Sequence, residues 1–149
     1  MPTRYSYEAG AHWRLHERGA VEAENIPSTF EFAVPPEFGG EPGFWTPEHL
    51  LLAAVASCYV ATFRGMADKS NLEFESISIK VEGVIEKKDG YLCFTRVTLR
   101  PEATIFYEHD RERADRLLEK AERGCLIMRS LEAECVLHPV IRVEAPVAV

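Results

Sequence analysis

One long apolar segment constrains this sequence more than any other feature. Residues 50–60 form the longest apolar run of the chain, and they directly follow Thr46, Pro47 and Glu48. This triplet is typical of a helix start, because threonine is a good N-cap, proline is favoured at the first helical position, and an acidic side chain complements the positive end of the helix dipole. We therefore expect a helix over residues 47–69.

The predicted helix is apolar around nearly its whole circumference in its first three turns, so it must be surrounded by protein on most sides. A single sheet in a chain of 149 residues can cover only one of its faces. The other face needs a second surface, and a second copy of the chain is the simplest source. The sequence therefore favours a homodimer with this helix buried at its centre.

Composition is consistent with one ordinary domain, which we place at residues 1–149. Hydrophobic residues make up 46% of the chain and charged residues 28%, which is enough apolar material for a sizeable core. The net charge of -7 argues against nucleic acid or an anionic membrane as the main partner, since phosphate binding needs a basic surface. No signal peptide is recognisable and the apolar run is too short to cross a bilayer, so we expect a cytoplasmic protein.

The remaining patterns predict further strands and one more long helix. Alternating polarity indicates strands at residues 4–13, 29–34, 77–85, 91–100 and 135–143. Asp89-Gly90 is a strong hairpin signal between two of these strands. An amphipathic helix is expected at residues 110–124, ended by Gly124, with a short helix or turn after it. This order of elements predicts an α+β fold with a mostly antiparallel sheet.

Four cysteines decide what chemistry the chain can carry, and they lie at positions 58, 93, 125 and 135. None of them forms a CxxC pair and no two histidines have zinc-ligand spacing, so we expect no metal site. In a cytoplasmic protein they are expected as reduced thiols rather than structural disulfides. Cys93 and Cys135 share strand parity with apolar neighbours, which indicates packing in the core.

Cys58 has two competing interpretations. A free cysteine in an apolar helix is most often a packing residue, because cysteine is among the most buried residue types. A redox nucleophile is the alternative, and three other residues favour it. Cys125 follows a glycine at a helix boundary, where backbone N–H groups can stabilise a thiolate. Glu48 lies at the start of the Cys58 helix, and Arg18 lies in a loop that can reach over the sheet.

Helix geometry limits how these residues can combine. Glu48 and Cys58 are ten positions apart on one helix, which separates them by about 15 Å. They cannot touch within one chain. If both serve one site, Glu48 must come from a second subunit whose helix runs antiparallel to the first, which agrees with the homodimer that the apolar helix favours.

At these residues the sequence resembles a known family. Residues 46–58, TPEHLLLAAVASC, are similar to the central helix of the OsmC/Ohr proteins, thiol-dependent organic hydroperoxide reductases, with the same interval between glutamate and cysteine. Other segments resemble the family in the same order along nearly the whole chain. These are its N-terminal strand at 11–13, its arginine loop at Arg18-Gly19, the strand after the central helix at 72–82, and its second cysteine at 121–125.

This resemblance implies a role for each candidate residue. Cys58 corresponds to the peroxidatic cysteine, whose thiolate attacks the peroxide O–O bond. Cys125 corresponds to the resolving cysteine, which condenses with the resulting sulfenic acid to form a disulfide. Arg18 corresponds to the arginine that stabilises the thiolate, and Glu48 to the carboxylate that holds the arginine. Arg14 is the alternative to Arg18.

The resemblance also implies an intertwined dimer of α+β subunits, with the central helices packed between mostly antiparallel sheets. The expected substrate is an organic hydroperoxide, and an apolar pocket suits an alkyl hydroperoxide because its apolar area contributes to binding. The expected reductant is a small dithiol or a dithiol protein, lipoylated in the Ohr branch. No cofactor is expected.

One departure from the family pattern lies beside the second thiol, where Leu126 takes the place of a frequent proline. Two other functions therefore stay open. A relative that kept the fold without peroxidase activity would bind a small apolar or thiol ligand between subunits. A thiol hydrolase or transferase would use Cys58 as a covalent nucleophile.

Overall fold

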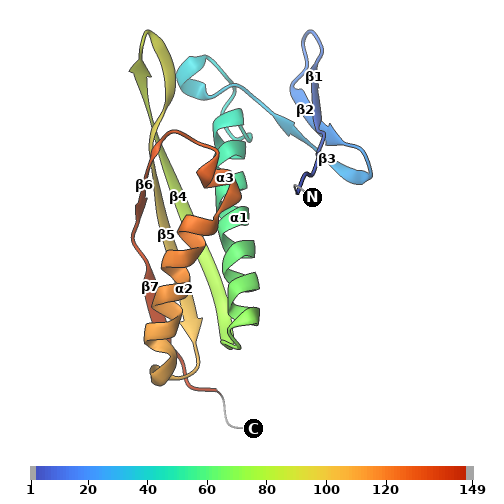
Figure 1. Cartoon of the computed structure of the whole chain (residues 1–149). Coiled ribbons are helices and arrows are strands. Elements are labelled where there is room, and N and C mark those ends of the chain that lie inside the picture. The colour runs from blue at the N-terminus through green and yellow to red at the C-terminus, as the bar shows by residue number, and fades with distance from the viewer. Residues whose placement is uncertain (1–2, 147–149) are drawn as a thin grey trace. The chain divides into compact units, whose positions relative to one another are not determined.

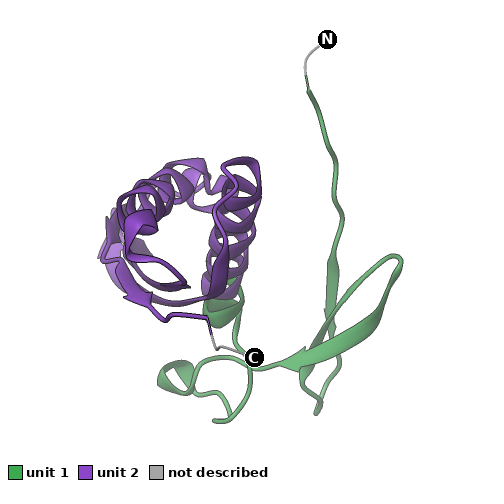
Figure 2. Ribbon diagram, turned by 90° about the horizontal axis from the view of Figure 1, so that it is seen from below, with its two compact units in different colours: residues 1–51 green, residues 52–149 purple. Residues whose placement is uncertain are grey.

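The computed structural model describes residues 3–146. The chain forms two compact units, unit 1 at residues 1–51 and unit 2 at residues 52–149, coloured green and purple in Figure 2. The boundary falls inside the long helix α1 (Pro47–Lys69), so the beginning of that helix is counted with unit 1.

Unit 1 contains a three-stranded antiparallel sheet in the order β1-β2-β3. The strands are β1 (Gly10–Trp13), β2 (Gly19–Ala23) and β3 (Ile26–Phe32). A 3-10 turn, η1 (Pro36–Phe38), follows in the loop that leads to α1. The backbone N–H of Ala33 donates to the carbonyl oxygen of Trp45 at 2.8 Å, which ties the end of this loop to the end of β3.

Two of the strand predictions need correction in unit 1, and one strand was not predicted. The strand predicted at residues 29–34 is instead Ile26–Phe32, because its pairing with β2 begins at Ile26. The strand predicted at residues 4–13 begins only at Gly10, because the residues before it have no strand partner in the described part of the chain. The strand β2 is absent from the predicted set, since its pattern is short and starts at a glycine. That glycine, Gly19, is required by packing: a Cβ added there would lie 2.4 Å from a ring carbon of Phe32.

The helix α1 has the bounds that the sequence predicts, Pro47–Lys69. Thr46 acts as its N-cap. The Thr46 hydroxyl oxygen accepts from the backbone N–H of His49 at 3.2 Å, and its carbonyl oxygen accepts from the N–H of Leu50 at 2.9 Å. These contacts satisfy N–H groups that a helix start otherwise leaves without partners.

We expect the Thr46→Ala variant to lower the free energy of unfolding by about 1 kcal/mol, because the cap is lost while the backbone is unchanged. Urea denaturation at a fixed protein concentration measures the difference. Thr46→Ser keeps the capping oxygen and is the matched control. If the alanine and serine variants were equally stable, Thr46 would not be acting through its hydroxyl.

By length and composition alone, α1 is also long and apolar enough to cross a membrane, with a mean hydropathy of 1.6 over its best window. The prediction that the apolar run is too short to cross a bilayer counts only the uninterrupted apolar residues. The helix continues beyond that run. Core helices of water-soluble proteins have the same property. Only 22% of this window is buried within the chain, so α1 leaves much of its surface uncovered.

Unit 2 is built on a mixed sheet with β5 (Tyr91–Ile105) as its central strand. On one side β5 forms a long antiparallel hairpin with β4 (Phe74–Lys88), and on the other it pairs in parallel with β6 (Glu134–Leu137) and β7 (Val140–Val143). Asp89 and Gly90 turn the hairpin with φ of 53° and 86°, the left-handed conformation that this two-residue turn requires. The longest ladder is thus antiparallel, and the predicted α+β class is confirmed.

The central strand continues through Pro101 to Ile105, beyond the end predicted at Arg100. Proline has no N–H to give to a neighbouring strand. Here β6 and β7 pair with β5 on either side of Pro101, so that the missing donor falls at the break between them. The strand predicted at residues 135–143 is accordingly split in two.

The expectation that Cys93 packs in the core is wrong, because its side chain is exposed. The ladder between β4 and β5 contains an irregularity at this point: Ile85 pairs with Phe94, but Val84 pairs with Arg96. The extra residue on β5, Thr95, reverses the alternation of its side chains. Counting alternate residues back from the buried Val97 assigns Cys93 to the core face. The extra residue moves it to the exposed face instead.

Helices α1 and α2 (Arg111–Gly124) cover the same face of this sheet (Figure 1). A 3-10 turn, η2 (Glu108–Asp110), precedes α2, and the short helix α3 (Leu126–Arg129) follows it. The buried face of α2 is the predicted stripe of Ala114, Leu117, Leu118 and Ala121. The core between helices and sheet includes the fully buried Val55, Tyr59, Phe63, Val97, Leu99 and Ile105.

Candidate active site

Two of the four cysteines meet inside unit 2. Cys58 lies on α1, and Cys125 lies at the junction of α2 and α3, where it caps the short helix. Their side chains are in hydrogen-bond contact. Cys58 is half-buried and Cys125 is fully buried. The Cys125 thiol also lies 3.8 Å from the carbonyl oxygen of Val55, a second acceptor for its proton.

The surroundings of Cys58 favour its thiolate. Burial raises the pKa of the Cys58 thiol, but hydrogen bonds to the sulfur outweigh this effect and leave the pKa below its ordinary value. The donors, in order of effect, are the Ile127 N–H, the Cys125 thiol, the Thr62 hydroxyl and the Leu126 N–H. The Thr62 hydroxyl also donates to the Cys58 carbonyl oxygen at 2.7 Å, so its single proton is shared between that oxygen and the sulfur.

The surroundings of Cys125 have the opposite effect. Burial raises the pKa of the Cys125 thiol, and so do its hydrogen bond to Cys58 and the negative charge there. The two thiols therefore divide into one that ionises readily and one that keeps its proton. Of the two sulfurs, Cys58 is thus the one more readily present as a thiolate, with the Cys125 thiol as one of its hydrogen-bond donors.

We expect the rate of alkylation of Cys58 by iodoacetamide to rise with pH around a midpoint below that of an ordinary free thiol. The sign follows from the lowered pKa: the reactive thiolate persists at pH values where an ordinary thiol is protonated. Quantitative peptide mapping of briefly labelled protein measures the profile. A short cysteine peptide labelled in parallel is the reference, and a Cys58 midpoint above that of the peptide would contradict the assignment.

Arg18 lies in unit 1, in a cluster of its own. Its guanidinium donates to both carboxylate oxygens of Glu41, at 3.2 and 3.3 Å, and to Glu31 at 3.3 Å. It lies over the ring of Phe44, with 4.0 Å between the guanidinium carbon and the ring centroid. The hydrogen bond to Glu41 raises the pKa of Arg18, so this side chain is a permanent cation. Of Arg14, the alternative candidate, only the backbone takes part in a hydrogen bond here, accepting from Glu17.

Glu48 lies in the first turn of α1, and its carboxylate is unusual. One of its oxygens, Oε2, is buried without a hydrogen-bond partner among residues 3–146. A buried carboxylate oxygen that lacks a donor is costly, so a donor that reached this oxygen would be stabilising. Glu48 and Cys58 lie ten positions apart on the continuous helix α1, which corresponds to about 15 Å along its axis.

The structure thus brings Cys58 and Cys125 together, whereas Arg18 and Glu48 belong to the other unit. The donors from α3 are the site residues that sequence reasoning missed. The glycine-cysteine boundary before α3 suggests N–H groups near Cys125, and those of Ile127 and Met128 do lower its pKa, but those of Ile127 and Leu126 also lower the pKa of Cys58. The replacement of proline by Leu126 is what makes one of them available, since proline would supply no N–H.

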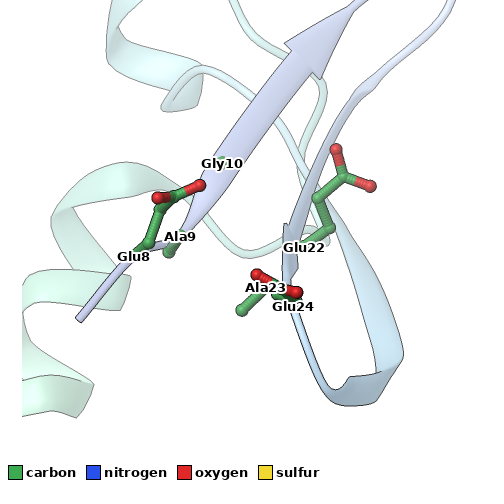
Figure 3. A pocket seen from close by; sticks show the side chains of 6 residues that line it. All are labelled: Glu8, Ala9, Gly10, Glu22, Ala23 and Glu24. Atoms are coloured by element: carbon green, nitrogen blue, oxygen red, sulfur yellow. The ribbon is translucent and has the colours of Figure 1, made fainter.

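The described residues of unit 1 line hollows at two places. One, of about 240 Å³, is lined by Gly43, Phe44, Trp45 and His49, beside the ring that Arg18 covers. The other, of about 320 Å³, lies at the open end of the β1–β2 hairpin, and Figure 3 shows Glu8, Glu22 and Glu24 around it. The second hollow contains no thiol or cation. In the described residues, no group of three or more His, Cys, Asp or Glu side chains is placed to hold a metal ion.

Comparison with known proteins relates this arrangement to one family. A family model described as OsmC-like protein matches residues 39–138. The chain is 27% identical to peroxiredoxin OsmC of Escherichia coli over 131 residues, which cover 85% of this chain and 90% of that protein. It is 28% identical to the uncharacterized protein YmaD of Bacillus subtilis over 135 residues, covering 86% and 87%. An OsmC-like protein of unknown function from Vibrio cholerae has the same fold, with a TM-score of 0.83 at 20% identity over 92% of this chain and all of that one.

Proposed function

Because the chain belongs to the OsmC-like protein family, we propose that it is a cysteine-based peroxidase that reduces organic hydroperoxides and protects against oxidative stress. The observation that carries this proposal is the contact between Cys58, a thiol whose pKa is lowered, and Cys125, a second thiol that can resolve it. A packing cysteine needs neither the donors around its sulfur nor a neighbouring thiol. The name of the Escherichia coli relative, a peroxiredoxin, agrees with this function.

In the proposed cycle, the Cys58 thiolate attacks the terminal oxygen of the hydroperoxide ROOH. The O–O bond breaks, the alcohol ROH leaves after taking up a proton, and Cys58 becomes a sulfenic acid. The Cys125 sulfur then attacks the Cys58 sulfur, and water leaves with the Cys125 proton, which yields a disulfide. The N–H groups of Leu126 and Ile127 stabilise the Cys58 thiolate at the start and end of the cycle.

The substrate is proposed to be an alkyl or aryl hydroperoxide rather than hydrogen peroxide. Cys58 lies on a helix that is apolar around most of its circumference and is covered over only part of its surface. An apolar substituent placed against such a surface adds to binding in proportion to the area it removes from water. Hydrogen peroxide has no such substituent.

A homodimer completes the proposed site. Because α1 is largely uncovered within one chain, a second copy packed antiparallel against it would bury both helices. The partner would bring its own Glu48 and Arg18 toward Cys58, so that the unpaired Glu48 oxygen gains a guanidinium donor and the thiolate gains a cation. In the isolated chain Arg18 donates to Glu41 and Glu31. Dimer formation would therefore replace these carboxylate partners of Arg18 with Glu48.

Regeneration of the two thiols requires two electrons from outside. We assign this step to a dithiol, either a small molecule or a lipoylated protein, since a dithiol reduces a disulfide by exchange and leaves as its own cyclic disulfide. The cycle balances without a resident metal or flavin. A cytoplasmic location, where thiols are kept reduced, is part of the same proposal.

We expect the Cys125→Ser variant to perform one turnover and then stop. Without Cys125 the sulfenic acid on Cys58 has no resolving thiol, and excess hydroperoxide oxidises it further. The test follows reduction of cumene hydroperoxide by dihydrolipoamide, with the mass of the protein measured alongside. The native chain should turn over continuously without lasting change in mass. Sustained turnover by the variant at the native rate would show that Cys125 is not the resolver.

A further inference from the structure

The sheet of unit 2 has a second face that its helices leave free. Helices α1 and α2 lie on one side of the sheet, and no helix within the described residues of this unit lies on the other (Figure 1). Ile79 and Val81 on β4 pack against the core on the helix side, as does Cys135 on β6, so the predicted core position of Cys135 is confirmed. Because successive side chains of a strand point to opposite faces, the residues between them project from the free side, which we call the outer face.

The outer face contains a hollow of about 520 Å³. It lies where β4 and β5 meet the break between β6 and β7, and the backbone N–H of His138 in that break donates to the carbonyl oxygen of Leu99 at 2.9 Å. The residues that line it include Ser78, Lys80, Arg100, Glu102, His138 and Val140. Pockets of roughly 300–1,000 Å³ bind small organic molecules, so this hollow is large enough for one.

Two permanent cations stand side by side in this hollow. Lys80 and Arg100 are directly opposite each other in the antiparallel ladder between β4 and β5. Among the ion pairs of residues 3–146 none involves Lys80, and Arg100 reaches only Glu82, at 4.0 Å, which is too long for a hydrogen bond. Like charges directly opposite destabilise a sheet, so an anion between them would be stabilising. This excess of positive charge is local, because the whole chain has a net charge of -7.

The other polar groups of the hollow are compatible with an anion. The Glu102 carboxylate would repel an anion if it were free, but it accepts a hydrogen bond from the Arg142 guanidinium. Ser78, opposite Glu102 in the ladder, adds a hydroxyl donor, and the imidazole of His138 adds a ring N–H. A guanidinium, an ammonium, a hydroxyl and an imidazole in one hollow supply donors for the several oxygens of a phosphate group.

We propose that this hollow binds a small organic phosphate. The phosphate group lies between Lys80 and Arg100, where its two negative charges offset the two cations. The organic part lies against Val140, an apolar side chain that is 48% exposed at the rim of the same hollow. Because Cys58 and Cys125 lie on the helix side of the sheet, this site is separate from the site of peroxide reduction and needs neither thiol.

Isothermal titration calorimetry of the full chain with phenyl phosphate tests the site. We expect one ligand per chain with a Kd of about 1 mM or lower at low ionic strength, where exposed charges are least screened. Inorganic phosphate should bind more weakly, because it has no ring to remove apolar surface of Val140 from water. If phenyl phosphate gives no more heat than sodium chloride of equal ionic strength, the proposal is overturned. Equal affinities for the two phosphates would overturn the placement of the organic part.

The Lys80→Gln variant separates a binding role of this lysine from a structural one. Loss of a charged donor should weaken phenyl phosphate binding by a factor on the order of 10 or more. Without ligand the variant should be at least as stable to urea as the native chain, because the repulsion from Arg100 is removed. The matched control is Arg96→Gln, which removes a cation of the same face of β5 that is paired with Glu134 outside the hollow. This control should bind as the native chain does, and equal losses in the two variants would show a general charge effect and no site.

Binding by the Cys58→Ser variant shows whether the site is independent of the peroxidase function. We expect this variant to bind phenyl phosphate with the native affinity, because the sheet separates the hollow from the thiols. Absence of peroxidase activity in a native chain that binds phenyl phosphate would contradict the proposed function and leave this site standing. Loss of binding in Cys58→Ser would contradict the separation of the two sites.

Discussion

The Cys58→Ser variant is expected to lose organic hydroperoxide reduction by a factor on the order of 10³ or more relative to the native chain. Serine keeps the size of the side chain but replaces a thiol of lowered pKa with an alcohol that does not ionise at neutral pH. An alcohol also cannot take up oxygen to form a sulfenic acid, so the first step of the cycle has no substitute in the chain.

The comparison requires a matched cysteine control, and the chain offers one. Cys93→Ser removes an exposed thiol on β5, outside the buried core, and should leave both turnover and stability unchanged. Turnover is measured with cumene hydroperoxide and a dithiol at equal protein concentrations. Full activity in Cys58→Ser, or an equal loss in both variants, would show that Cys58 is not the peroxide-reactive thiol.

The Phe63→Ala variant is expected to lower the free energy of unfolding by about 3–5 kcal/mol, because it opens a cavity in the centre of unit 2. Phe63 is fully buried on the sheet-facing side of α1. Its ring meets that of Phe74 edge to face, with 5.3 Å between the centroids. Because the same helix carries Cys58, a loss of packing here also loosens the support of that side chain.

Urea denaturation at one fixed protein concentration measures this effect, since any self-association makes apparent stability depend on concentration. Phe38→Ala is the control, because the same side chain is removed at a position that is 55% exposed. It should change the free energy of unfolding by less than about 1 kcal/mol. Equal effects of the two substitutions would mean that Phe63 is not a core residue of the folded protein.

The sequence predicted the helices more fully than the sheet. A helix start with an N-cap and proline, followed by an apolar run, leaves little freedom, and α1 has the predicted bounds. The stripe on α2 follows directly from helical periodicity. Strand parity, by contrast, holds only while the ladder is regular, and one irregular residue at Thr95 exposes Cys93. The course of β5 through Pro101 depends on where β6 and β7 break, which local pattern cannot show.

For the candidate site, the sequence indicated the two thiols but not what surrounds them. The contact between Cys58 and Cys125 joins segments far apart in the chain, and the resemblance of each segment to a known motif is what paired them. The N–H donors of Leu126 and Ile127 belong to the backbone, so the residue types at these positions do not indicate them. Arg18 could be named, but its bonds to Glu41 and Glu31 depend on loop geometry that no spacing rule fixes.

The most direct test of the account is intact mass measurement with peptide mapping of the reduced protein, before and after one equivalent of cumene hydroperoxide. At the earliest quench, the account predicts loss of two hydrogens and a peptide that links Cys58 to Cys125. An unchanged mass, with both thiols still open to alkylation, would contradict it. Cys58 would then be a packing cysteine, and a fold that binds a small apolar or thiol ligand without reducing peroxide would replace the peroxidase.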